Sequence, residues 1–331
     1  MIELINQFYQ DITTTINNAE EPWTNILLAQ AGIKRMTPPQ EKSAFKILLT
    51  NPMIHSLLTK LETQNEDLVH FETKLPDHAN YSSFYWILNF LADIGLNGEE
   101  LNLKPIITKF FLIQNEDGLF TTGYRRRSKL PISLFCISAH LTSILIRLGY
   151  GNTPNIKAAI RFIVTAQRPD GSWHCVVSKQ RGERDENSPG CMTANIFALR
   201  ALGSFGHGFE KKIVAAAFEQ ILDGFFRGDP CCPCCDLEYA AISHKLRYPA
   251  HYLGLDYLHV LDTLSLYPEW CAGRKFEEFI ALLLKKKTIS RLLVSEKTIP
   301  SWKEFDFART NSASSWITAI ACRALQRIYK L

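Results

Sequence analysis

The chain has 331 residues, of which 46% are hydrophobic and 21% are charged, with a formal net charge of +4. Its 17 glycines and 15 prolines, together with the lack of any low-complexity tract, exclude a collagen-like or largely disordered chain. So small a net charge gives no reason to expect nucleic-acid binding. No apolar run approaches the ~18 residues of a membrane span, and residues 1–6 lack the pattern of a signal peptide, so we expect a cytoplasmic protein without a transmembrane segment.

Apolar segments of helical periodicity recur along the chain, and the clearest of them end on a glycine. Gly95, Gly149 and Gly203 stand 54 residues apart, and each closes such a segment where glycine suits a left-handed C-cap. The spacing widens to 63 residues on either side of this block, back to Gly32 and forward to residues 266 and 329. The recurrence predicts a helix that ends at each of these positions.

A second set of helical segments lies between the glycine-ended ones. Residues 106–113 and 158–166 are each followed by a turn, at 114–120 and 167–173, in which Gln, Asp, Gly and an aromatic residue recur 53 residues apart. Pairing the two sets gives six helical hairpins over the whole length. Because one hairpin cannot bury its apolar face alone, the hairpins must stack, and we predict an all-α fold.

Two features favour a closed ring of hairpins over an open solenoid. Both sets of helices are strongly apolar, as an inner ring covered by an outer ring requires, and the C-terminus lacks a polar capping hairpin. The predicted fold is therefore a closed α/α toroid of twelve helices. It forms a single domain over residues 1–331, with residues 1–80 as its N-terminal hairpin.

The turn at residues 167–173 and the helix before it resemble a motif of a known family. Residues 162–173, Phe-Ile-Val-Thr-Ala-Gln-Arg-Pro-Asp-Gly-Ser-Trp, resemble the Gln-and-Trp repeat of squalene and other triterpene cyclases, and the related repeat of protein prenyltransferase β subunits. Other segments are similar to a degenerate copy of the motif (107–120), to the inner helices of the family (193–202 and 315–325) and to a stretch of its small, single-domain bacterial and archaeal members (247–261). The resemblance covers about residues 80–330 and implies the α/α toroid and an apolar cavity of isoprenoid size.

The function that the resemblance implies is an isoprenoid-processing or isoprenoid-binding enzyme, with a small apolar molecule as its partner. The acidic motif of the family is missing, however. Terpene cyclases protonate an alkene with an aspartic acid just before an inner helix, and residues 189–193 here are Pro-Gly-Cys-Met-Thr, without a carboxyl group. The Asp, Cys and His zinc site of protein prenyltransferases also has no convincing counterpart. A non-catalytic binding scaffold is accordingly the alternative.

A third possibility is a carbohydrate-active enzyme, because rings of six helix pairs also host glycosidases and lyases. Such an enzyme needs two carboxylates that face the cavity at a defined separation. The acidic residues near the ends of predicted inner helices are Asp185, Glu186, Asp256 and Glu304.

The N-terminal ends of the inner helices would line the cavity of a toroid. Aromatic and small polar residues dominate these ends; aromatic rings suit an apolar ligand or a carbocation, although at helical spacing they are also typical of a core. The predicted substrate-binding residues are Tyr85, Trp86, Phe135, His140, Thr193, Tyr252 and Trp316. The predicted catalytic residues are Cys191, His251 and Asp256. Asp256 would act as a general acid or base paired with His251, or would only cap the helix that follows it.

The nine cysteines, without a secretion signal, indicate thiols or metal ligands more than a disulfide framework. Four of them lie within the five residues Cys231–Cys235. The predicted ligands are Cys175, Cys191, Cys231, Cys234 and His244, which suit zinc or, with cysteine alone, an iron–sulfur cluster. A Cys175–Cys191 contact or disulfide, and thiols without a role, are the alternatives. Cys136, Cys271 and Cys322 are expected to be buried thiols.

Two basic runs, residues 125–129 and 285–287, are interpreted as solvated loop or helix ends, with an anion site as the alternative. The charged loop at residues 179–187 is in the same way either a surface loop or a lid that grips a diphosphate. The sequence does not indicate an oligomeric state.

Overall fold

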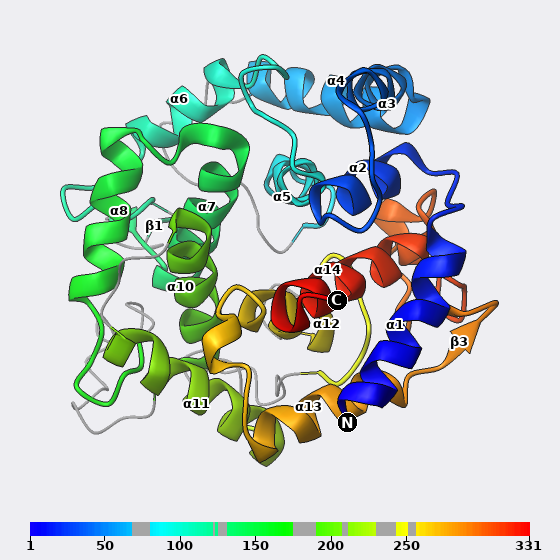
Figure 1. Cartoon of the computed structure of the whole chain (residues 1–331). Helices are drawn as coiled ribbons and strands as arrows, with labels where there is room; N and C mark the ends of the chain where they lie inside the picture. The colour runs from blue at the N-terminus through cyan, green and yellow to red at the C-terminus, as the bar shows by residue number, and fades with distance from the viewer. Residues whose placement is uncertain are drawn as a thin grey trace. The chain divides into compact units, whose positions relative to one another are not determined.

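Figure 1 shows a computed structural model of the chain. The structure describes residues 1–67, 80–121, 123–124, 131–174, 190–206, 211–229, 243–250 and 256–331. These residues are mostly helical, with two short two-stranded sheets, so the prediction of an all-α fold is confirmed. Among them, no helix combines the length and the apolar character that crossing a membrane requires.

The chain divides into two compact units. Unit 1 consists of Met1–Thr59, Ser243–Ala250 and Asp256–Leu331, and unit 2 consists of Lys60–Ile242 and His251–Leu255. Each unit buries apolar side chains of its own. The single domain and its closed ring of twelve helices stay predictions.

Three helices of unit 2 are buried on all sides over most of their length. They are α5 (Phe84–Ile94), α7 (Phe135–Leu145) and α10 (Met192–Phe205), and α7 packs against both of the others. Every residue of α5 and α7 is buried, and α10 is buried from Met192 to Leu202. A helix that is buried all round must be covered by other elements, as the prediction of inner helices requires.

The remaining helices of unit 2 bury one face each. They are α6 (Lys104–Leu112), α8 (Pro154–Thr165) and α11 (Lys211–Arg227), while α4 (Pro52–Asp67) begins in unit 1 and ends in unit 2. In α8 the buried residues Ile156, Ala159, Ile160 and Ile163 follow one another at helical spacing. The amphipathic pattern of α6, α8 and α11 is the one that covering helices need.

Unit 2 also contains a short antiparallel pair of strands, β1 (Gly123–Tyr124) and β2 (Pro131–Ile132), in which Gly123 pairs with Ile132.

The glycines that end these helices fit the sequence in two cases and depart from it in a third. Gly95 ends α5 with a φ of 89°, and Gly149 has a φ of 96° at the end of the π-helical turn η2 (Ile146–Tyr150) that continues α7. The prediction that a helix ends at Gly203 is wrong, because α10 continues to Phe205. The left-handed φ of 122° lies at Gly206 instead. Gly203 lies inside α10, where a glycine is tolerated, and Gly206, three residues later, ends the helix.

The two matched turns make the same hydrogen bonds. Gln114 Nε2 donates to the carbonyl of Gly118 (2.7 Å) and to that of Asn155 at the start of α8 (2.8 Å). Gln167 Nε2 donates to the carbonyl of Gly171 (2.9 Å) and to that of Ile213 near the start of α11 (2.8 Å). Each glutamine therefore closes its own turn and ties it to the next covering helix.

The glycine of each turn lies directly against that same helix. A Cβ on Gly171, whose φ is 84°, would stand 2.2 Å from Cβ of Ala216 in α11. A Cβ on Gly118, whose φ is 92°, would stand 2.7 Å from the carbonyl carbon of Ala158 in α8. The motif that carries the family resemblance thus holds the covering helices together by close packing.

Unit 1 is built around helix α14 (Ser315–Tyr329), which is buried from Ser315 to Leu325. α14 packs against α1 (Ile2–Ile16), α2 (Pro22–Gln30) and α12 (Tyr257–Leu264). Helices α3 (Pro38–Thr50) and α13 (Arg274–Leu284) complete the unit, together with the single-turn helices η3 (Pro268–Trp270), η4 (Pro300–Trp302) and η5 (Asp306–Ala308). Unit 1 therefore joins the first and the last helices of the chain.

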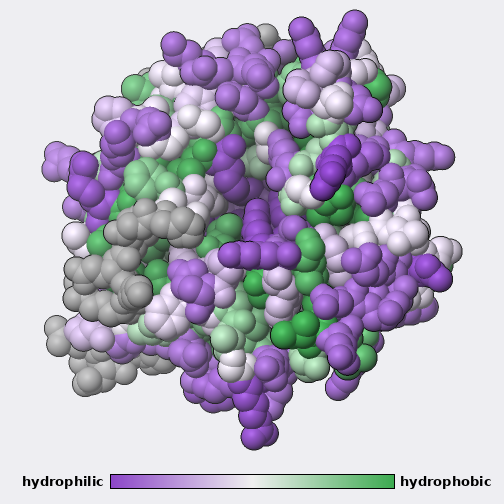
Figure 2. All heavy atoms as spheres, in the orientation of Figure 1, coloured by the Kyte–Doolittle hydropathy of each residue, from purple (hydrophilic) through white to green (hydrophobic). Residues whose placement is uncertain are grey.

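A small hairpin, β3 (Thr288–Ile289) with β4 (Leu292–Leu293), lies beside α1 in unit 1 (Figure 1). On the face of the molecule drawn in Figure 2, the hydrophobic patches are small and hydrophilic side chains separate them. This face is typical of one that contacts water.

Candidate functional site

The first turn of α14 gathers two carboxyl groups around one serine. Asp306 Oδ2 accepts hydrogen bonds from the backbone N–H of Ser315 (2.5 Å), from Ser315 Oγ (2.9 Å) and from the backbone N–H of Trp316 (3.4 Å). Oε2 of Glu21, just before α2, lies 2.9 Å from the same Ser315 Oγ, and Thr24 Oγ1 lies 3.2 Å from it. We call Asp306 and Glu21 the acid pair.

The hydroxyl of Ser315 constrains the charge that the acid pair can carry. Ser315 Oγ has one proton, so it can donate to one carboxylate at a time. With both acids ionised, the second carboxylate oxygen faces a hydroxyl oxygen with no proton between them. A single proton on the acid pair removes the repulsion between two neighbouring carboxylates. The arrangement is thus suited to hold one proton.

The surroundings of Asp306 change its acidity. Burial raises its pKa above the ordinary value of 3.8, the hydrogen bonds from Ser315 oppose this, and the nearby charge of Glu21 adds to the rise. All the hydrogen bonds go to Oδ2, whereas Oδ1 is buried and has no hydrogen-bond partner among the described residues. A proton on Oδ1 leaves every bond to Oδ2 in place. Asp306 can therefore hold a proton that is shielded from water and release it without rearrangement.

Aromatic rings surround this part of the chain. Asp306 lies between Phe305 and Phe307, whose rings stack with centroids 5.1 Å apart. The ring of Phe307 is 6.1 Å from that of Trp316 and 4.9 Å from that of Tyr248. Trp316, one of the predicted substrate-binding residues, is fully buried. Apolar rings disfavour an ionised carboxyl and offer π faces to a cation.

A second aromatic group lies in unit 2, where α5, α7 and α10 meet. We call it the His140 cluster, and it consists of Tyr85, Trp86, His140 and Phe197. The ring of His140 stacks on that of Phe197 with centroids 4.1 Å apart and planes 7° apart, and Nδ1 of His140 lies 2.5 Å from the hydroxyl of Tyr85. Trp86 meets Tyr85 edge-on at 5.2 Å. Three predicted substrate-binding residues are thus brought together, and their rings pack on one another.

Tyr85 of the His140 cluster carries no charge. Burial raises the pKa of Tyr85 well above its ordinary value, so the phenol keeps its proton. When this phenol donates to Nδ1, the neutral imidazole of His140 carries its proton on Nε2. The aromatic faces of the cluster suit apolar groups, either those of the cluster itself or those of a ligand.

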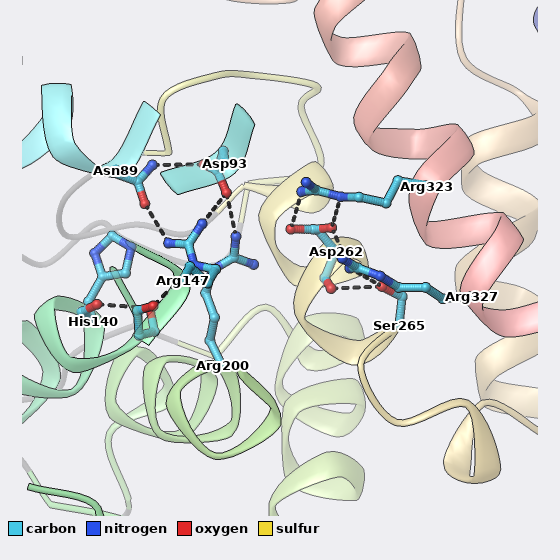
Figure 3. Close-up of polar contacts among 10 residues, drawn as sticks. Asn89, Asp93, His140, Arg147, Arg200, Asp262, Ser265, Arg323 and Arg327 are labelled. Carbon is cyan, nitrogen blue, oxygen red and sulfur yellow. Dashed lines mark hydrogen bonds and ion pairs between the residues drawn. The ribbon is translucent and has the colours of Figure 1, made fainter. Parts of the chain in front are cut away.

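An ion network joins the same three helices near their C-terminal ends (Figure 3). Asp93 of α5 pairs with Arg147, which follows α7, and with Nη2 of Arg200 in α10 at 2.9 Å. Asn89 donates to Asp93 (2.9 Å) and accepts from Arg147 (3.1 Å). The side chains of Asp93 and Arg200 are only 2% and 3% exposed. Such pairs are stable in the interior only when every member is hydrogen-bonded, so this network fixes the helices relative to one another.

Unit 1 contains a similar network. Asp262 of α12 accepts from Nε and Nη2 of Arg323 in α14, at 3.1 and 2.9 Å, and from Nη1 of Arg327 at 3.1 Å (Figure 3). Ser265 lies 3.3 Å from Arg327. The bidentate geometry with Arg323 orients α12 against α14.

The other predicted site residues lie apart from these groups. Phe135 stacks on Trp173 at 6.3 Å, and Thr193 is buried in the first turn of α10. Asp256 stands at the N-cap of α12 without a side-chain capping bond, and its Oδ2 lies 3.7 Å from Nε of Arg247. Cys191, at the N-cap of α10, is a buried thiol. Outside the described residues lie His251, Tyr252, the acidic residues Asp185 and Glu186, and the charged segments 125–129 and 179–187.

Of the five predicted metal ligands, the structure describes two, Cys191 and His244. Cys191 belongs to unit 2, whereas His244, in unit 1, is exposed and accepts from Lys286 through its carbonyl oxygen. Cys175, Cys231 and Cys234 lie outside the described residues. Within the part of the chain that the structure describes, no three His, Cys, Asp or Glu residues form a group that could hold a metal ion. The zinc or iron–sulfur site stays a prediction.

The acid pair and the ion networks are what the sequence analysis missed. Asp93 and Arg147 each stand two residues before a repeat glycine, so opposite charges at one repeat position could have indicated their pairing. No such pattern marks Asp306, because it lies in a stretch without helical periodicity. Its partner Glu21 is reached only through folding.

Comparison with known proteins finds similarity in structure alone. No family model and no curated protein matches the chain. A protein from Actinoplanes is 12% identical over 93% of this chain and 90% of its own, with a TM-score of 0.44. A variant of the type II terpene cyclase MstE from Scytonema, in complex with its substrate geranylgeranyl dihydroxybenzoate, is 12% identical over 100% of both chains, with a TM-score of 0.42. Another MstE variant, without ligand, gives 12% over 99% and 98%, also with a TM-score of 0.42. Values this low carry no conclusion about the chemistry of this chain.

Proposed function

We propose that this chain is an acid catalyst that acts on an apolar, isoprenoid-type molecule, with Asp306 as the proton donor. The observation that carries this proposal is the Asp306 carboxyl group. It has a raised pKa, one fully hydrogen-bonded oxygen and one buried oxygen without a partner among the described residues. This is what a general acid needs, because the proton must be held away from water and released to the substrate.

The substrate class comes from the family resemblance of residues 162–173 and from the aromatic rings near Asp306. Protonation of a carbon–carbon double bond places positive charge on the neighbouring carbon, which a second double bond of the same molecule can attack. Loss of a proton to the Asp306 carboxylate then restores the acid and leaves an isomer of the substrate. The π faces of Phe307 and Trp316 would stabilise the cation between these steps.

Asp306 could also replace the acid that is missing from residues 189–193. The aspartic acid that the resemblance leads one to seek at residues 189–193 is absent, and Asp306 offers a carboxyl group at the N-terminal end of a different buried helix, α14. Its place there has a physical advantage, since the amides of the first helical turn stabilise the carboxylate that remains after proton transfer.

A non-catalytic protein that binds an isoprenoid is the second candidate function. It is favoured by the lack of a carboxyl group at residues 189–193 and by the rings of the His140 cluster, which pack on one another as a core does. A carbohydrate-active enzyme has less support. Of its possible carboxylates, Glu304 is exposed and Asp256 is paired with Arg247.

The test is a turnover assay in D2O with geranylgeranyl dihydroxybenzoate as the probe, because cyclisation by proton transfer adds one deuteron to the substrate and removes one proton from it. The wild-type protein should yield an isomer that carries one deuterium, detected by mass spectrometry. Asp306→Asn should lower turnover by about 10²–10⁴-fold, the usual contribution of a general acid, while binding of the probe followed by tryptophan fluorescence is retained. Asp117→Asn, the same change at an exposed aspartate, serves as the control.

The outcomes separate the candidates. Turnover that survives in Asp306→Asn would exclude Asp306 as the acid. Binding without any isomer in the wild-type protein would establish the second candidate, and neither binding nor turnover would remove the isoprenoid proposal itself. The metal site is a separate proposal. Native mass spectrometry of anaerobically purified protein supports it if a zinc or iron–sulfur mass is present and is lost in Cys191→Ala.

A further inference from the structure

The positive charge of the chain is concentrated in one segment of unit 1. Residues 285–309 contain seven Lys or Arg and three Asp or Glu, while the rest of the chain contains 30 of each. The whole formal excess of +4 therefore lies in this segment. Its densest part is residues 285–291, Lys-Lys-Lys-Thr-Ile-Ser-Arg, which contains no acidic residue; we call it the basic hairpin, because it forms β3 and the turn to β4.

Most of these charges are available to a partner. Lys285, Lys287 and Arg291 are exposed, and none of them forms an ion pair within the described part of the chain. Lys286 is different, since its Nζ bonds Glu296 at 2.8 Å and thereby anchors the base of the hairpin. The basic hairpin thus presents three exposed cations, and the Lys286–Glu296 ion pair holds its base in place.

The tip of the hairpin carries an exposed apolar side chain among these cations. Ile289 is 38% exposed, directly before the two-residue turn Ser290–Arg291. Beside the hairpin, α1 packs against β4 and exposes Ile2 and Leu4 in its first turn, at 65% and 63%. In Figure 1 the hairpin lies at the edge of the view, next to α1.

The turn itself is unfavourable for the residues that form it. Ser290 and Arg291 have φ of 50° and 65°, the left-handed values that a turn of this type requires and that Asn-Gly adopts most easily. An arginine at such a position incurs backbone strain that a glycine would avoid. The strain is consistent with a role for the cation at the tip.

We propose that the basic hairpin docks the protein on an anionic lipid surface, with Lys285, Lys287 and Arg291 facing the headgroups and Ile289 entering between them. An apolar side chain ringed by cations fits a lipid interface, where a charged layer lies over hydrocarbon. A nucleic acid would use the cations and leave Ile289 in water. Docking of this kind is independent of Asp306 and goes beyond the proposed catalysis.

The test is co-sedimentation of the full chain with vesicles of phosphatidylcholine, alone or with about 30 mol% phosphatidylserine. We expect binding to the anionic vesicles only, and release of the protein when salt is raised from about 0.1 M to about 1 M, since screening shortens the reach of the charges. Changing Lys285, Lys287 and Arg291 together to Gln should weaken binding on the order of 100-fold, because each charge near the surface contributes roughly a factor of five.

Two further variants make the test specific. Changing the exposed Lys42, Lys46 and Lys60 together to Gln removes the same charge elsewhere and should leave binding within about twofold. Ile289→Ser should weaken binding to anionic vesicles at unchanged charge. Equal losses in the two triple variants, an unaffected Ile289→Ser, or binding to a DNA duplex but not to vesicles would each overturn the proposal.

Discussion

The contact between Gly171 and α11 allows the role of the matched turn to be measured. Replacing Gly171 by Ala adds one methyl group that would stand 2.2 Å from Cβ of Ala216, far inside ordinary van der Waals contact. The helix cannot retreat freely, because Gln167 holds the carbonyl of Ile213 at 2.8 Å, near the start of α11. The new methyl group must therefore strain the turn or force it away from α11.

The expected cost has two parts. A non-glycine residue at a φ of 84° costs about 1 kcal/mol, and overpacking by one methyl group against a held helix costs about 2 kcal/mol more. We expect Gly171→Ala to lower the free energy of unfolding by about 3 kcal/mol. Gly228→Ala is the matched control, because Gly228 has a similar φ of 72° with no atom within 4 Å of the added Cβ. It should cost about 1 kcal/mol.

A double-mutant cycle separates the clash from everything else. Ala216→Gly removes the opposing methyl group and leaves the new Cβ of residue 171 at 3.3 Å from the nearest atom of residue 216. Alone it should cost about 1 kcal/mol, as glycine does inside a helix, whereas in the Gly171→Ala background it should regain about 1 kcal/mol, because relief of the clash outweighs that cost. The coupling energy should be about 2 kcal/mol.

Urea denaturation followed by far-UV circular dichroism at 25 °C gives the four free energies of unfolding that the cycle needs. Equal costs for Gly171→Ala and Gly228→Ala would refute the close contact. A coupling energy near zero would do the same, because it would place the damage somewhere other than between residues 171 and 216.

Three further predictions test other parts of the molecule. Asp93→Ala should lower the free energy of unfolding by about 3–5 kcal/mol, because it removes the carboxylate that pairs with the buried cation of Arg200; urea denaturation measures this, and a loss below about 1 kcal/mol would contradict the network. Because the pKa of Asp306 is raised in the folded protein, the native state binds more protons than the unfolded state just above pH 3.8, so this group's contribution to stability falls as pH rises through that window. Asp306→Asn should therefore gain stability relative to the wild type between pH 4 and neutral pH, and an unchanged difference across that range would argue against a raised pKa. Burial also raises the pKa of Cys271 and Cys322. Neither thiol should react with iodoacetamide at about pH 8 until urea unfolds the protein, as peptide mass mapping would report, and labelling of the native protein would contradict their burial.

Local pattern was enough to predict the helical character of the chain. The apolar segments before Gly95 and Gly149 formed α5 and α7 with its continuation η2, because periodicity and a left-handed glycine act over neighbouring residues. The same rule failed at Gly203, where the chain offered Gly206 three residues later and local sequence did not choose between them.

Long-range contacts were harder to predict. Ser315 and Glu21 are 294 positions apart, and their contact exists only because α14 packs against α2. Asp306 has no helical periodicity around it, so nothing in its neighbourhood marked it as more than an acidic loop residue. The Asp93–Arg147 pair lay within reach of the repeat, but Arg200 stands one residue off that register and could not be found by it.

The joining of first and last helices in unit 1 has a consequence for synthesis. Ile5, Tyr9, Ile12 and Ile16 of α1 are buried in the finished protein, where α1 packs against α13, α14 and β4, all of which are made last. At about 5–20 residues per second, the ribosome needs tens of seconds to pass from α1 to α14, and during that time this apolar face has no cover from them. The last residue of unit 2 is made before α13 and α14. Unit 1 begins first along the chain, but unit 2 is therefore the first to have all of its residues. A chain truncated before residue 315 would leave the apolar faces of α1 and α2 without α14 to cover them. We expect chaperones and proteases to recognise such a chain.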